Sequence, residues 1–296
     1  MAFCGKKRID ISLGIVYMII VRTIDALRAA ASSWRRAGKT VALIPTMGAL
    51  HEGHLSLVRL GQTICDQTIV TIFLNPFQFG KNEDLGSYPS NLAQDTEILK
   101  VVGADLLFTP DNKEMYPDGF STDVNPGPIS KTLCGAVRPG HFRGVATIVT
   151  KLLMQSQPDK AIFGEKDYQQ LLVIRKISSD LNIPVEIVSA PTQRGSDGLA
   201  LSSRNAYLSP SERSLAPLLY RTLCRVAEEI KARPETPDEI CACADQELRS
   251  SGFSTVDYLT LCDSETLEYM QFYDRPARLF AAANLGKTRL IDNVQL

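Results

Sequence analysis

Two of the three histidines stand three residues apart, in the run His51-Glu52-Gly53-His54. This run directly follows Pro45-Thr46-Met47-Gly48-Ala49-Leu50. A helix that begins here would point free N–H groups at an anion, and side chains three apart share a helix face, so both imidazoles could meet one ligand. Gly53 removes a side chain where a nucleotide must come close. The pattern predicts a site that handles phosphate; the alternative is two histidines that stand near a loop by chance.

Two further segments offer hydrogen-bond donors for a phosphate chain. Gly164-Glu165-Lys166-Asp167 places one lysine, a point charge suited to phosphate, between two carboxylates. Leu201-Ser202-Ser203-Arg204 gathers two hydroxyls and a guanidinium, which suits a triphosphate. Taken singly, the first segment could be a solvated charged turn and the second a helix-capping loop.

A third group of residues suits a small organic ligand. In Phe73-Leu74-Asn75-Pro76-Phe77-Gln78-Phe79, two amides stand among apolar side chains, which fits a ligand with both methyl groups and hydroxyls. The alternative is a strand end with an Asn-Pro turn. The third histidine, His141, lies in the basic, glycine-containing segment 138–144, a candidate lid or phosphate contact. We expect His141 to shape this segment rather than to catalyse.

The cysteines and histidines do not indicate a metal site or disulfides. A helical zinc motif needs His-Glu-x-x-His, and the spacing here is one residue shorter. Seven cysteines, an odd number with scattered spacing and no Cys-x-x-Cys, predict reduced and mostly buried thiols. Such thiols are typical of a cytoplasmic protein.

The bulk composition is that of a globular protein with a large core. The chain has 296 residues, 44% of them hydrophobic, and a formal net charge of -1. That charge gives no overall basic field for nucleic acid or anionic lipid. An apolar stretch over residues 11–21 follows Lys6-Lys7-Arg8, but it contains no cleavage site and is too short to span a membrane. We therefore expect residues 1–17 to be an extension outside the fold, with no membrane partner.

Strands and helices alternate through the first two-thirds of the chain. The apolar pattern predicts strands over residues 18–21, 41–44, 69–74, 106–108, 161–163 and 185–188. It predicts helices over 24–36, 55–65, 92–102, 145–154 and 171–181. Short, continuously apolar strands separated by helices indicate a parallel sheet with helices on both faces. The fold class is therefore α/β, with a Rossmann-like domain over residues 18–192.

The unusual polar segments all follow strands of this sheet. In such sheets ligands bind beyond the carboxyl ends of the strands. Residues 45–48, 75–78 and 164–167 each come directly after a predicted strand. They should therefore lie at one edge and form an enzyme cleft.

The pattern changes after Pro191. Two helices are predicted over residues 212–231 and 237–250, followed by strands over 256–261, 277–283 and 288–292. Asn284-Leu285-Gly286-Lys287 should form a hairpin turn between the last two. We expect a smaller α+β domain over residues 193–296 that could close over the site.

Taken together, these motifs resemble the pantothenate synthetase (pantoate–β-alanine ligase) family. The resemblance rests on residues 45–54, 75–79, 138–144, 164–170 and 197–205, and it extends from about residue 18 to the end. The His-x-Gly-His element alone would indicate only the wider nucleotidylyltransferase and class I tRNA-synthetase group.

The resemblance implies an ATP- and Mg²⁺-dependent carbon–nitrogen ligase. In that family (R)-pantoate attacks the α-phosphorus of ATP, giving pantoyl adenylate and pyrophosphate. β-Alanine then displaces AMP to give pantothenate, the coenzyme A precursor. The family also implies a homodimer formed through the first domain.

The resemblance also implies roles for individual residues. His54 matches the proton donor and His51 its partner on the nucleotide, while Lys166 would hold phosphate during transfer. The residues implied for ATP are Met47, Gly48, Ala49, Leu50, His51, Glu52, Gly53, His54, Gly164, Glu165, Lys166, Asp167, Gln193, Leu201, Ser202, Ser203 and Arg204. Those implied for pantoate are Pro45, Asn75, Gln78 and Gln170, and Gln78 would also contact β-alanine. Mg²⁺ would arrive with ATP, with Asp95 and Asp167 as candidate ligands.

Two positions depart from related patterns. Leu201 stands where related synthetases carry a lysine, so Lys166 would supply the cation. Gln193-Arg194-Gly195-Ser196 lacks the acidic residue often found after the arginine.

Two other functions are alternatives for this set of motifs. A nucleotidylyltransferase acting on a phosphorylated acceptor would want more basic residues in the acceptor pocket. A non-catalytic nucleotide sensor would be expected to lack His54 or Lys166, and both are present.

Overall fold

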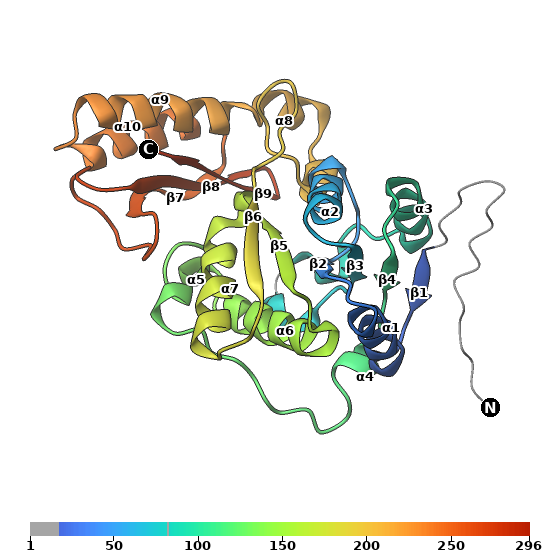
Figure 1. Ribbon diagram of the computed structural model, residues 1–296. Coiled ribbons are helices and arrows are strands. Elements are labelled where there is room, and N and C mark those ends of the chain that lie inside the picture. Colours follow the sequence, from blue (N-terminus) through green and yellow to red (C-terminus); the bar gives the residue numbers. More distant parts are fainter. Residues whose placement is uncertain (1–17, 82) are drawn as a thin grey trace, which may run out of the picture.

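The computed structural model describes residues 18–81 and 83–296, and a six-stranded sheet forms its centre (Figure 1). The strand order is β1-β4-β3-β2-β5-β6, and every pairing in the sheet is parallel. The strands are β1 (Ile19–Val21), β2 (Val41–Thr46), β3 (Gln67–Ile72), β4 (Leu106–Phe108), β5 (Lys160–Gly164) and β6 (Glu186–Ala190). The predicted parallel sheet is confirmed; the prediction for residues 1–17 lies outside the described residues.

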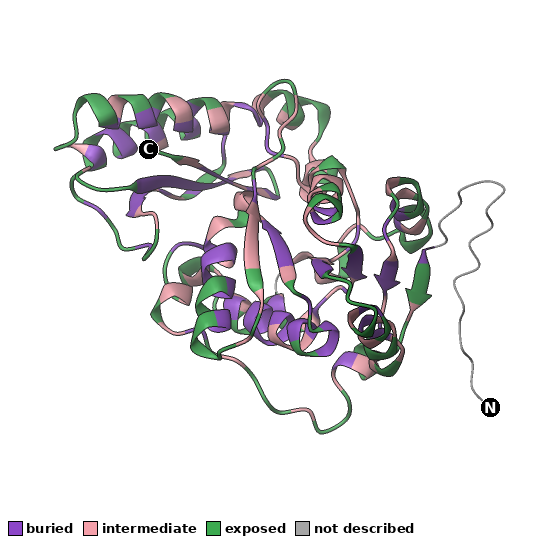
Figure 2. Ribbon diagram, viewed as in Figure 1, coloured by how far each residue is buried: buried purple, intermediate pink, exposed green. Residues whose placement is uncertain are grey.

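Helices cover both faces of this sheet. Successive side chains of a strand point to opposite faces, and here the side chains on both faces are apolar and need to be buried. Val41 and Leu43 pack with helices α1, α6 and α7, whereas Ala42 and Ile44 pack with α2 and α3. The central strands are accordingly buried on both sides (Figure 2). These helices are α1 (Ile24–Arg36), α2 (Glu52–Ile64), α3 (Leu92–Val102), α6 (His141–Ser156) and α7 (Tyr168–Asp180). The shorter ones are α4 (Asn112–Met115) and α5 (Cys134–Val137), with 3-10 turns η1 (Pro76–Gln78), η2 (Asp84–Ser87), η3 (Pro128–Ser130) and η4 (Glu165–Asp167).

The C-terminal part has its own sheet and core. Strands β7 (Thr255–Asp263), β8 (Ala277–Leu285) and β9 (Thr288–Gln295) pair antiparallel, and α9 (Leu218–Ala232) and α10 (Pro237–Ser250) pack on them. This α+β unit lies beside the parallel sheet in Figure 1. The predicted hairpin between β8 and β9 is confirmed, with Gly286 at a φ of +54°.

The prediction of one continuous helix at the start of the C-terminal part is wrong. The expected helix over 212–231 is two helices, α8 (Pro210–Leu215) and α9, with Pro217 between them. Proline has no backbone N–H and obstructs the preceding helical turn, so the first helix ends there. Ser209 and Glu212 form a capping box that starts α8 two residues earlier than expected. The 3-10 turn η5 (Ser203–Tyr207) precedes it.

The topology brings the polar segments together. Strands β3, β2 and β5 are neighbours in the sheet, so their carboxyl ends at Ile72, Thr46 and Gly164 share one edge. Within residues 18–81 and 83–296, no helix is long and apolar enough to span a membrane.

Candidate active site

The paired imidazoles are held at the start of α2 by reciprocal hydrogen bonds. His51 is the N-cap, and its Nδ1 accepts the backbone N–H of Gly53 at 3.1 Å. The Nδ1 of His54 accepts the backbone N–H of His51 at 3.3 Å. The two ring centroids are 4.1 Å apart. Both rings line one cavity, as the spacing predicts.

Burial and neighbouring groups set the protonation state of both rings, and the hydrogen bonds set which ring nitrogen carries the proton. Burial, together with the positive charge of Lys166, lowers the pKa of His51 from 6.5 to about 4. Burial and the neighbouring His51 lower the pKa of His54 from 6.5 to about 3. Both imidazoles are therefore neutral at pH 7. Because each Nδ1 accepts a hydrogen bond, each proton resides on Nε2, which is free to donate to a ligand.

The loop between β2 and α2 is held by Asp95 of α3. The two carboxylate oxygens of Asp95 accept the N–H groups of Ala49 and Leu50, both at 2.9 Å, and Asp95 is buried. Gly48 has a φ of +86°, and a Cβ there would lie 3.0 Å from Asp95 Oδ2. This geometry argues against Asp95 as a Mg²⁺ ligand, because its oxygens are engaged by the loop. Asp95 instead holds the turn at residues 48–50, which leads into the histidine segment.

The lysine segment reaches the same place from β5. Lys166 lies in η4, directly after β5, with 18% of its side chain exposed. Its Nζ is 3.8 Å from Asp167 Oδ1. Lys166 and Asp167 line the cavity that holds the imidazoles. A cation and two neutral donors therefore face one space.

Residues 201–204, the serine–arginine loop, follow the parallel sheet in sequence and line the same cavity. The hydroxyl of Ser203 donates to the carbonyl of Ala49 at 3.1 Å, which joins two segments 154 residues apart. Ser202 caps η5 through the N–H of Arg204 at 3.3 Å. Arg204 donates to both oxygens of Asp84, with Nε–Oδ2 of 3.0 Å and Nη2–Oδ1 of 2.8 Å. The predicted convergence of this loop on the histidine segment is confirmed.

Amide side chains also line this cavity. Asn75 Nδ2 donates to Gln78 Oε1 and to the carbonyl of Gly144, both at 3.1 Å. Tyr116 donates to Asn75 Oδ1 at 2.8 Å, so the amide of Asn75 is held on both sides. Sequence reasoning did not identify Tyr116, which lies 41 residues away without a local motif.

The segment around His141 shapes this wall. Nδ1 of His141 donates to the carbonyl of Gln78 at 2.8 Å, and Nε2 accepts from Arg138 at 3.0 Å. Arg138 also pairs with Glu83, with 2.9 Å between Nε and Oε1. Burial and the charge of Arg138 lower the pKa of His141 to about 4. These contacts agree with a shaping role for His141.

Most of the predicted residues border one cavity of about 230 Å³. They are Pro45, Met47, His51, Gly53, His54, Asn75, Gln78, Gly164, Lys166, Asp167, Gln170, Gln193, Leu201, Ser202, Ser203 and Arg204. The other five implied for ATP lie outside its lining. Gly48 and Ala49 belong to the loop that Asp95 holds, Glu52 pairs with Arg59 on the surface, Leu50 packs against the core, and Glu165 faces Arg278.

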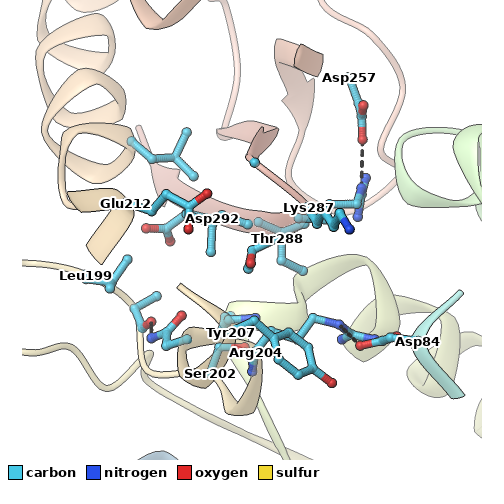
Figure 3. A pocket seen from close by; sticks show the side chains of 18 of the residues that line it. Asp84, Leu199, Ser202, Arg204, Tyr207, Glu212, Asp257, Lys287, Thr288 and Asp292 are labelled. Atoms are coloured by element: carbon cyan, nitrogen blue, oxygen red, sulfur yellow. Dashed lines mark hydrogen bonds and ion pairs between the residues drawn. The ribbon is translucent and has the colours of Figure 1, made fainter. Parts of the chain in front are cut away.

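A second cavity of about 1140 Å³ continues from the first. Lys166, Asp167, Ser202 and Arg204 border both cavities. In Figure 3 the segment from Ser202 to Tyr207 faces Lys287, Thr288 and Asp292 of the β8–β9 hairpin across it. The space is ample for a nucleotide whose phosphates lie at the junction.

Comparison with known proteins shows the family of this chain. The family model described as pantoate-beta-alanine ligase matches residues 19–295. A pantothenate synthetase from Paramagnetospirillum magneticum is 53% identical over 275 residues, which cover 93% of this chain and 96% of the relative. One from Rhodospirillum rubrum is 51% identical over 276 residues, covering 93% and 98%.

Solved structures agree as well. Pantothenate synthetase from Thermus thermophilus matches with a TM-score of 0.87 and 44% identity, covering 94% of this chain and 99% of that one. A pantoate-beta-alanine ligase from Francisella tularensis, complexed with beta-gamma ATP and beta-alanine, matches with a TM-score of 0.80 and 35% identity, covering 94% and 98%. The chain therefore belongs to the pantoate–β-alanine ligase family.

Proposed function

We propose that this chain joins (R)-pantoate to β-alanine in two steps, at the cavity shared by His54, Lys166 and Arg204. The observation that carries the proposal is the hydrogen bond between Ser203 and Ala49, because it brings the serine–arginine loop onto the histidine segment. Donors for a triphosphate then lie beside an amide-lined pocket that suits a hydroxy acid.

In the first step the pantoate carboxylate attacks the α-phosphorus of ATP, and pyrophosphate leaves. Negative charge grows on the phosphate oxygens as the new bond forms. The Nε2–H groups of neutral His51 and His54 donate to those oxygens, and Lys166 adds a positive charge. His54, with its pKa of about 3, acts as a hydrogen-bond donor rather than as an imidazolium. Leu201 lacks a charge, so Lys166 takes the part that a lysine plays in related synthetases.

The remaining ATP contacts follow the chain around the cavity. Ser202, Ser203 and Arg204 hold the β- and γ-phosphates, for which Arg204 must share the donors that now contact Asp84. The loop 47–50 and the segment 164–167 flank the nucleotide. The backbone of Gln193 contacts adenine; its carbonyl already accepts from Leu201 at 2.9 Å, which leaves the N–H for the base.

Pantoate lies among Pro45, Asn75, Gln78 and Gln170. Gln78 is 8% exposed, so its amide is largely shielded from bulk water. In the second step the amine of β-alanine, beside Gln78, attacks the acyl carbon of pantoyl adenylate, and AMP leaves. Exclusion of water from this pocket would protect the acyl phosphate from hydrolysis between the two steps.

The residues present suit Mg²⁺ that is carried in by ATP. Mg²⁺ keeps several waters and is usually held by one or two carboxylates together with phosphate oxygens. Asp167 is the carboxylate that borders both cavities beside Lys166. When bound, Mg²⁺ would offset phosphate charge, with Asp167 as its protein contact.

We also propose the larger organisation of the enzyme. The domain boundary lies near residue 192, just after β6 ends at Ala190, and the domain 193–296 closes over the nucleotide. A homodimer would form through the first domain, where the edge strand β1 exposes Ile20. The compartment is the cytoplasm, where free thiols such as the six described cysteines are usual.

Pantoate-dependent exchange of pyrophosphate into ATP tests this proposal. We expect exchange only when pantoate is added, because the carboxylate must attack before pyrophosphate can leave. Exchange without pantoate would contradict it, as would a requirement for a phosphorylated acceptor. That requirement would favour the nucleotidylyltransferase alternative.

A further inference from the structure

One side chain of the C-terminal sheet holds the turn that carries Lys166. The amide nitrogen of Asn293, in β9, donates to the carbonyls of Glu165 and Lys166, both at 3.0 Å. Asn293 is 4% exposed, so both hydrogen bonds are shielded from water. Residues 293 and 166 are 127 positions apart, and the contact crosses from one domain to the other.

The orientation of this amide is fixed by its neighbours. Arg278 donates to Asn293 Oδ1 at 2.5 Å, which leaves the amide nitrogen to face the two carbonyls. The guanidinium of Arg278 lies 3.8 Å from the ring centre of Tyr168, the first residue of α7. The backbone N–H of Asn293 donates to Asp292, which in turn pairs with Arg194 at 2.6 Å. The donor is therefore preorganised before any ligand binds.

Among the described residues, an ion pair between Glu165 and Arg278, 3.7 Å apart, also links this turn to the C-terminal sheet. Residues 165–167 form a single 3-10 turn between β5 and α7, and Asp167 makes no side-chain cap to α7. The Lys166 side chain extends from this turn into the junction of the two cavities. A shift of the turn would thus move the ammonium group relative to the phosphates.

We propose that Asn293 is a positioning residue for Lys166 and that, through it, the C-terminal domain sets where the lysine charge lies during adenylation. The proposal rests on the phosphate-binding role given above to Lys166. Asn293 borders neither of the two cavities assigned to the nucleotide and pantoate; it acts through the two carbonyls that it holds. Lys166 is therefore placed to meet the phosphates only while β9 packs against η4.

A double-mutant cycle separates this role from simple domain adhesion. Exchange of pyrophosphate into ATP, with pantoate present, is measured for the parent chain, Asn293→Asp, Lys166→Ala and the double variant. Asn293→Asp keeps the size of the side chain and the acceptor for Arg278 but replaces the donor by a carboxylate oxygen that repels the two carbonyls. We expect Asn293→Asp to lower the exchange kcat between about tenfold and a hundredfold, with the KM for pantoate unchanged. In the Lys166→Ala background, the same substitution should lower the exchange kcat by less than about twofold.

Asn284→Ala is the matched control. Asn284 belongs to the same sheet, and its side-chain amide hydrogen-bonds to Thr255 and Asp257 of β7. Its exchange rate should equal that of the parent chain. Hydrogen exchange of amides 165–168 should be faster in Asn293→Asp and unchanged in Asn284→Ala, which tests the positioning even if activity is lost altogether.

An equal loss from Asn293→Asp in both backgrounds, or unchanged amide protection at 165–168, would overturn the positioning role. Normal exchange by Lys166→Ala would instead overturn the role of Lys166 in the proposed function. Full activity of Asn293→Asp would show that the donor is dispensable.

Discussion

The Nδ1 of His54 accepts the backbone N–H of His51, and the two rings lie 4.1 Å apart. Each side chain thus helps to hold the other at the first turn of α2. The arrangement explains why the two histidines are spaced as they are: the third helical position is the one that reaches back to the N-cap. It also leaves the two Nε2–H groups as the donors that meet the ligand.

Replacing His54 by alanine should lower pantoate-dependent pyrophosphate exchange by about a hundredfold to a thousandfold, the usual cost of losing one transition-state donor. His54→Gln, whose amide nitrogen can occupy the Nε2 position, should retain more activity than His54→Asn, which has no donor there. Steady-state exchange and circular dichroism of all three variants check this. Near-normal exchange by a folded His54→Ala would refute the role given to His54.

The buried, neutral imidazoles should also make stability depend on pH. The pKa of His54 is about 3 in the folded chain, against about 6.5 when unfolded. Between these values the unfolded state binds a proton that the folded state does not, so stability falls as the pH drops below 6.5. His54→Asn should therefore lose less in Tm than the parent between pH 7 and pH 5. Identical losses in the two chains would mean that His54 is not buried as a neutral group.

Asp95 should support stability and activity by holding the loop at residues 48–50, and not by binding Mg²⁺. Asp95→Asn replaces one acceptor by a donor that faces a backbone N–H, so we expect a loss of about 1–3 kcal/mol in the free energy of unfolding. Exchange should fall without any change in its dependence on Mg²⁺ concentration. Denaturant unfolding and a Mg²⁺ titration check both parts. A raised Mg²⁺ requirement with unchanged stability would restore Asp95 as a metal ligand.

Much of the architecture could be predicted from local sequence. Helix α1 has the predicted bounds because Thr23 caps it and Gly38 follows its end, and α3 has them because Asn91 caps it and Gly103 adopts a left-handed conformation. The continuous apolar strands predicted the parallel sheet. That topology, with the rule for strand ends, was enough to place the histidine, amide and lysine segments together.

Other features depend on contacts that no local pattern reveals. Helix α6 begins at His141, although the glycines at 140 and 144 suggested a loop there. Gly144 is instead required inside the helix, because a Cβ would lie 2.2 Å from the carbonyl oxygen of Phe77. The pair between Asp84 and Arg204 likewise joins residues 120 positions apart. Such contacts are set by packing, so only the folded chain identifies them.

The oxygen that joins pantoate to phosphorus provides the most direct test of the account. When pantoate labelled with ¹⁸O in its carboxylate reacts with ATP and β-alanine, one labelled oxygen should appear in the phosphate of AMP. The other should stay in the amide carbonyl of pantothenate. AMP without label, or label in inorganic phosphate with ADP as the second product, would contradict attack on the α-phosphorus at this site.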